Sequence, residues 1–115
     1  MDGKLKNIDF VKIEAMVEDD LDFRDQLLDA IKAAVEELEK AYLKGISEKD
    51  PVVIRQSRHK IKPTLGLFDL QRLSTLLANG KRLMAEKGFT EEVEKHKKDF
   101  LAATEAVLQE INNYR

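Results

Sequence analysis

Apolar residues recur at intervals of three and four along almost the whole chain, which is the period of a helix with one buried face. Interruptions by Asp, Gly and Pro divide this pattern into five predicted helices. A short first helix extends from Asp9 to Val17. The second begins at Asp22, whose side chain we expect to cap it, and ends near Gly45.

The third predicted helix has the clearest start signal in the sequence. Asp50 is a preferred N-cap residue, and Pro51 suits the first helical position because the backbone N–H that it lacks would be unpaired there anyway. The apolar pattern then continues to about Leu67, so we predict a helix up to that residue.

Two more helices complete the chain. The fourth follows Phe68-Asp69 and stops at Lys87-Gly88, where Gly can adopt the left-handed terminal conformation. Thr90 is expected to cap the fifth. Four long helices with short connections predict an all-α fold, namely an antiparallel up-and-down four-helix bundle with a short extra N-terminal helix.

Length and composition agree with one helical domain that spans residues 1–115. Chains usually divide into domains only above about 250 residues. A chain rich in Leu, Ala, Glu and Lys, with only 5 Gly and 2 Pro, favours helix. The net charge of −2, with 20 basic and 22 acidic residues intermixed, gives the protein as a whole no electrostatic reason to bind nucleic acid or anionic lipid.

The absence of several residue patterns narrows the class of protein further. Without cysteine there is no disulfide or thiolate zinc site, and two well-separated histidines make no recognisable metal cluster. The chain lacks an apolar run of signal-peptide length and the roughly 20 apolar residues of a membrane span. We therefore expect a cytoplasmic protein that binds neither membrane nor metal.

His59 lies on the outer side of the third predicted helix. At roughly 100° per residue, one arc of this helix should face the core, and it holds Ile54, Ser57, Ile61, Leu65 and Phe68. The opposite side carries His59 together with Val52, Arg55, Gln56, Lys62, Pro63 and Gly66. We call this second set the His59 stripe and expect it to be exposed.

The surroundings of His59 favour an anion. No acidic residue occurs from Pro51 to Phe68, although acids make up 22 of the 115 residues. Four cations surround the imidazole in sequence: Arg55, Arg58, Lys60 and Lys62. Pro63 and Gly66 weaken the helix but leave little side chain in the way of a partner.

Imidazole is a suitable nucleophile in such a place. Its unperturbed pKa of about 6.5 leaves much of it neutral at pH 7, with a ring nitrogen free to attack phosphorus without a separate base. No Ser, Cys or carboxylate lies in hydrogen-bond register with His59 on this helix, which argues against a hydrolytic nucleophile and base pair. The charge pattern by itself leaves a plain solvated surface open as the alternative.

The segment His59-Lys60-Ile61-Lys62 resembles the His-x-x-Lys core of histidine-containing phosphotransfer domains, where it lies in the middle of a helix of a four-helix bundle. The resemblance extends to the Asp-led start of that helix, to the two long helices that follow and to the small Gly66. It also includes four apolar positions: Ile61, Leu65, Phe68 and Leu73. The resemblance to this family therefore covers most of the chain.

The resemblance implies a phosphorelay intermediate. His59 would accept a phosphoryl group on its outer ring nitrogen from a receiver-domain aspartate, and Lys62, three positions along the helix, would help to hold the phosphate. The partners would be response-regulator receiver domains, a hybrid histidine kinase, or both. The expected partner-binding residues are Val52, Arg55, Gln56, Lys60, Pro63 and Gly66.

The same resemblance limits what the chain itself must supply. The receiver brings the magnesium ion, so this chain needs no cofactor of its own. It contains no ATP-binding module, so we expect no autokinase activity. We expect it to act as a monomer.

Pro63 departs from the family pattern, in which Gly commonly follows the Lys. The ring of Pro63 should clash with the carbonyl group of His59, and its nitrogen cannot bond that carbonyl. We therefore predict a modest bend of the helix that leaves the imidazole uncovered.

Two other functions compete with phosphotransfer. A non-catalytic helical adaptor would use the surface around Val52, Pro63 and Gly66 to bind a receiver or another helix pair without phosphate chemistry. Nucleic-acid binding is disfavoured, because the basic helix has no interleaved aromatic residues and the net charge is negative.

The second histidine, His96, lies among Lys95, Lys97 and Lys98 on the last predicted helix. It lacks the small neighbours and the sequence pattern that surround His59. Exposed long charged side chains are ordinary on protein surfaces, so we predict that His96 is a surface residue.

Overall fold

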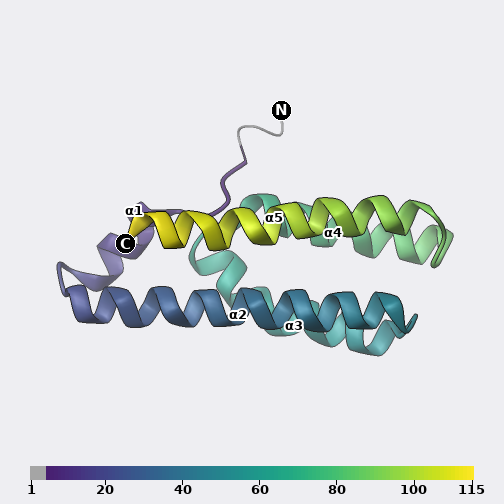
Figure 1. The fold of residues 1–115 in the computed structure, drawn as a ribbon, viewed down its shortest axis with the longest axis horizontal. Coiled ribbons are helices and arrows are strands. Elements are labelled where there is room, and N and C mark those ends of the chain that lie inside the picture. Colours follow the sequence, from purple (N-terminus) through teal and green to yellow (C-terminus); the bar gives the residue numbers. More distant parts are fainter. Residues whose placement is uncertain (1–4) are drawn as a thin grey trace.

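Five helices are present in a computed structural model, which describes residues 5–115 (Figure 1). They are α1 (Phe10–Val17), α2 (Leu21–Ser47), α3 (Pro51–Leu67), α4 (Gln71–Lys87) and α5 (Glu92–Tyr114). No strand occurs in this part of the chain, which confirms the predicted all-α class. None of the helices within residues 5–115 has both the length and the apolar character needed to cross a membrane.

Asp50 starts α3 as predicted. One carboxylate oxygen of Asp50 accepts hydrogen bonds from the backbone N–H groups of Val52 at 3.1 Å and Val53 at 3.3 Å. Pro51 occupies the start of the helix, where the missing N–H leaves no carbonyl unpaired. The direction in which the His59 stripe points is therefore fixed from the first turn of α3.

The predicted bounds of α2 were wrong at both ends. The helix starts at Leu21 because Asp20, not Asp22, is its cap, accepting a hydrogen bond from the Phe23 N–H at 3.0 Å. It continues past Gly45 to Ser47. Gly45 does not end the helix but permits close packing, since a Cβ there would lie 2.7 Å from Ile54 Cγ1 of α3.

The junction of α4 and α5 confirms one prediction and corrects another. Gly88 ends α4 with a φ of +69°, a backbone conformation that side chains other than glycine rarely adopt. Thr90 does not cap α5, because the N-cap position belongs to Glu91 and no side chain bonds there. Thr90 instead accepts a hydrogen bond from the Val93 N–H through its backbone carbonyl, at 3.0 Å.

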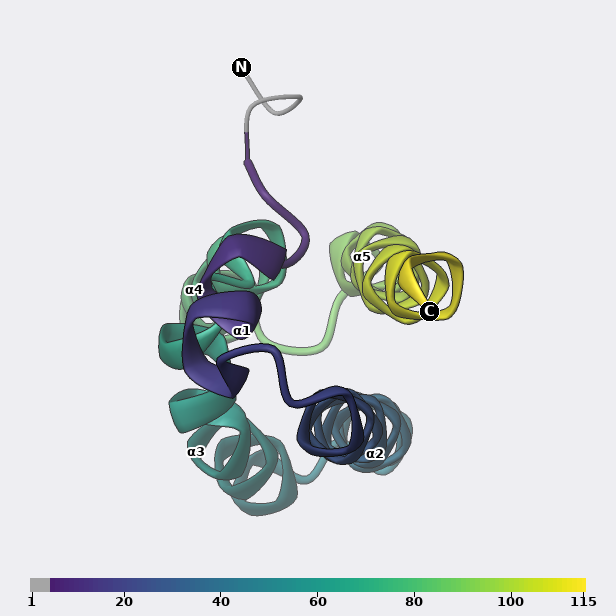
Figure 2. The same ribbon diagram turned by 90° about the vertical axis from the view of Figure 1, so that its left-hand side faces the viewer.

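The helices form a bundle around a continuous apolar core. α2 packs against α3 and α5, and α4 packs against α5, whereas α3 and α4 contact each other much less. Viewed along the long axis, α2 to α5 surround a common interior, and α1 lies across one end (Figure 2). The largest fully buried side chains are Tyr42, Phe100, Ile13, Leu28, Leu70 and Leu73. This packing leaves one face each of α3 and α4 outside the core.

Candidate functional site

His59 lies in the middle of α3 with its side chain exposed to solvent. The other residues of the His59 stripe are exposed as well. On the opposite side, Ile54 and Ile61 are only 2% and 3% exposed and hold α3 against the bundle. The buried hydroxyl of Ser57 donates a hydrogen bond to the Ile54 carbonyl at 2.7 Å. The predicted division of α3 into a core side and an outer side is confirmed.

Pro63 does not end α3. The helix continues through it to Leu67, and His59 stays exposed one turn before the proline. Because Pro63 has no N–H, the carbonyl of His59 lacks the donor that a helix normally provides four residues on. The ring of the proline is itself exposed, so it does not bury the imidazole.

His59 opens onto a surface groove between α3 and α4. We call it the α3–α4 groove; its lining residues are Arg55, Arg58, His59, Lys62 and Leu65 of α3 and Ser74, Leu77, Ala78 and Lys81 of α4. Among residues 5–115, no carboxylate lines this groove. The groove therefore brings four cations and one imidazole to the same hollow.

The four cations of the groove, Arg55, Arg58, Lys62 and Lys81, have no carboxylate partner among the described residues. Like charges gathered around a hollow create a positive local potential even on a protein whose net charge is −2. An anion with several oxygens, such as a phosphoryl group, is the chemical complement of this arrangement.

Lys81 is the site residue that the sequence analysis missed. It comes from α4, and its neighbours in the groove wall, Ser74 and Ala78, precede it by seven and three positions. That spacing puts all three on one face of a helix, with small side chains that keep the wall open. The sequence shows that Ser74, Ala78 and Lys81 share one face of a helix, but it does not show which other helix that face lies beside.

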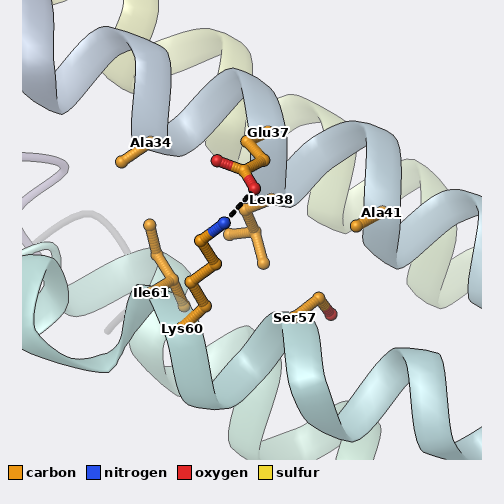
Figure 3. Close-up of a pocket in the computed structure, with 7 residues that line it drawn as sticks. All are labelled: Ala34, Glu37, Leu38, Ala41, Ser57, Lys60 and Ile61. Carbon is orange, nitrogen blue, oxygen red and sulfur yellow. Dashed lines mark hydrogen bonds and ion pairs between the residues drawn. The ribbon is translucent and has the colours of Figure 1, made fainter.

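Lys60 is placed differently from the groove cations. Its side chain reaches across to α2 and forms an ion pair with Glu37 (Figure 3). Beneath this pair lies a small pocket between the two helices, with walls formed by Ala34, Leu38, Ala41, Ser57 and Ile61. Although α3 itself has no acidic residue near His59, α2 places the carboxylate of Glu37 beside Lys60.

The prediction for His96 was wrong, because this side chain is buried, with 6% exposure. Its Nε2 lies 2.8 Å from the hydroxyl oxygen of Tyr42, which is fully buried on α2. Burial lowers the pKa of His96 and raises the pKa of Tyr42 to about 12, the latter opposed by the positive charge of Arg58. We call these two residues the buried Tyr42–His96 pair.

The sequence did carry a signal for the burial of His96. Val93, His96, Phe100, Ala103 and Val107 follow one another at intervals of three and four, and all are buried. The flanking lysines belong to the other faces of α5. The position of His96 in the helical period is therefore a better guide to its burial than the charge of its neighbours in the sequence.

Comparisons of the chain with protein-family models, curated proteins and solved structures find no match. Among residues 5–115, no three His, Cys, Asp or Glu side chains gather as potential metal ligands. The site combines an exposed imidazole in the middle of a helix with cations in the same groove that have no carboxylate partner within residues 5–115.

Proposed function

We propose that this chain is a histidine-containing phosphotransfer domain that works in a multistep His–Asp phosphorelay. In this proposal α2 to α5 form an antiparallel up-and-down four-helix bundle, and His59 accepts a phosphoryl group from a receiver aspartate and passes it to another receiver. The observation that carries the proposal is the exposed His59 beside the unpaired cations of the α3–α4 groove. The His-x-x-Lys pattern of His59 and Lys62 supports it independently.

The transfer needs little from the carrier. The outer ring nitrogen of neutral His59 attacks phosphorus; a nitrogen–phosphorus bond forms as the bond to the aspartyl oxygen breaks. The aspartate leaves as a carboxylate, and the proton on the other ring nitrogen stays in place, so the total charge is unchanged. Lys62 stabilises the charge on the equatorial oxygens, and this positioning and charge stabilisation is the main requirement of phosphoryl transfer.

The proposed partners are receiver domains of response regulators, a hybrid histidine kinase, or both. They would contact the exposed surface of α3 around His59, including Val52, Arg55, Gln56, Lys60, Pro63 and Gly66. The magnesium ion of the reaction would come with the receiver. The proposal includes a monomeric carrier in the cytoplasm.

The second candidate function is a helical adaptor that binds a receiver without taking its phosphate. It is favoured by two large apolar side chains that α3 leaves in solvent, Val52 at 48% exposure and Leu67 at 55%. The two residues lie at opposite ends of α3, and exposed apolar side chains can contribute to a protein contact surface. The adaptor and the carrier differ only in whether His59 becomes phosphorylated.

Incubation of the protein with a phosphorylated receiver domain tests the proposal. We expect transfer of label to the chain as an acid-labile, base-stable phosphate, and complete loss of labelling in His59→Gln. Because His59 is exposed, the variant should keep the thermal unfolding curve of the wild type, which serves as its control. Labelling of His59→Gln at the wild-type rate would refute the assignment, and binding of the receiver without any labelling would favour the adaptor.

A further inference from the structure

The two walls of the α3–α4 groove, α3 and α4, are connected mainly through the other two long helices, α2 and α5, rather than by direct contact. α3 packs on α2, α2 packs on α5, and α5 packs on α4, while α3 and α4 make few contacts with each other. The width of the groove and the position of Lys81 relative to His59 therefore depend on how α2, α5 and α4 meet inside the bundle.

The buried Tyr42–His96 pair lies at this meeting point. It joins α2 to α5 by a hydrogen bond of 2.8 Å. Gly80 of α4 packs directly against it, since a Cβ at Gly80 would lie 2.3 Å from His96 Nε2 and 2.6 Å from the Tyr42 hydroxyl oxygen. The next residue along α4 is Lys81, which lines the groove.

The pair is also close to the other wall of the groove. Arg58, adjacent to His59 on α3, is half-buried and is one of the groove cations. Its positive charge lowers the pKa of the Tyr42 hydroxyl and so opposes part of the rise that burial causes. One buried hydrogen bond is thus in contact with α4 through Gly80 and in electrostatic reach of α3 through Arg58.

We propose that α4 supplies a second phosphate-binding residue, Lys81, and that the buried Tyr42–His96 pair holds Lys81 in register with His59 and Lys62. This inference rests on the proposed phosphotransfer function. A phosphoryl group on His59 would have Lys62 on the α3 side and Lys81 on the α4 side, so its oxygens are contacted from both walls. Tyr42 and His96 are positioning residues, because neither reaches the groove.

The role of Lys81 in phosphate binding is tested by titrating the full chain with inorganic phosphate and observing the titration by NMR. We expect saturable shifts at groove residues, and Lys81→Ala should weaken binding about two- to fivefold, the range typical of a solvent-exposed charge pair. Lys81→Arg keeps the cation and should restore most of the affinity. Lys98→Ala removes the same charge from an exposed position outside the groove and should bind phosphate like the wild type.

The second part is tested by a double-mutant cycle. Tyr42→Phe removes one oxygen and leaves the ring that packs on Phe100 at 4.5 Å between centroids, so the variant should fold. We expect it to weaken phosphate binding at least about twofold when Lys81 is present and to have no effect in the Lys81→Ala background. A general loss of stability would not depend on Lys81 in this way.

The outcomes separate this inference from the function on which it rests. Absence of saturable phosphate binding, equal binding by Lys81→Ala and the wild type, or an equal effect of Tyr42→Phe in both backgrounds overturns the inference. The labelling of His59 by a receiver is measured separately. Labelling at the wild-type rate in Lys81→Ala would leave the relay in place but remove Lys81 from it.

Discussion

Replacement of Gly80 by alanine tests whether the contact of α4 with the buried Tyr42–His96 pair is as close as the structure has it. Alanine is the better helix former, and in an exposed helix interior the exchange is favourable by about 1 kcal/mol. Here the added Cβ would lie 2.3 Å from His96 Nε2, 2.6 Å from His96 Cε1 and 2.6 Å from the Tyr42 hydroxyl oxygen. Neither ring can move without losing its place in the core.

The expected loss is larger than the gain in helix propensity. Forcing a methyl group into a filled core costs about 1–3 kcal/mol. Separation of the Tyr42–His96 pair leaves two buried polar groups unsatisfied, at a further cost of about 1–3 kcal/mol. We therefore expect Gly80→Ala to lower the free energy of unfolding by about 3 kcal/mol, which would lower the Tm by about 10 °C in a domain of this size.

Gly66→Ala is the matched control, because it makes the same exchange inside a helix at a site where, in the described part of the chain, no atom apart from the adjoining backbone lies within 4 Å of the added Cβ. It should raise the free energy of unfolding by about 0.5–1 kcal/mol. Chemical denaturation followed by circular dichroism measures both variants. If Gly80→Ala proves as stable as Gly66→Ala, the close contact between α4 and the pair does not exist.

Two further predictions concern the groove and the buried histidine. Lys62→Ala should slow phosphotransfer to His59 without changing thermal unfolding, because Lys62 is exposed and lies off the core side of α3; loss of cooperative unfolding in this variant would contradict its placement. The pKa of His96 is lowered in the folded protein because burial opposes the charged ring, an effect that Asp99 partly offsets. In the unfolded chain the ring has its ordinary pKa of about 6.5, so its contribution to stability is present above that value and is lost as the pH falls toward the folded-state pKa. Denaturation curves of the wild type and His96→Gln between about pH 7 and pH 5 should diverge, the wild type losing more stability, and parallel curves would show that His96 is not desolvated.

Much of the local structure follows from the sequence alone. Asp50 and Pro51 start α3 where predicted, because a cap and a helix start depend on residues a few positions apart. The 3.6-residue period put His59 outside and Ile54 and Ile61 inside, because the direction of a side chain depends only on its position along the helix. His96 was wrongly predicted to be a surface residue, because its charged neighbours were given more weight than its position in the helical period.

Contacts between helices could not be predicted in this way, because periodicity shows that a helix has a buried face but not which helix covers it. Only the tertiary structure brings Lys81 to the groove of His59, pairs Lys60 with Glu37, and joins His96 to Tyr42. Each of these contacts links residues more than 20 positions apart in the sequence. Caps and periodicity were enough to predict the start of α3 and the side that it buries, because both depend on residues close together in the chain. Which charges share a surface depends on how α3 packs on α2, α2 on α5 and α5 on α4.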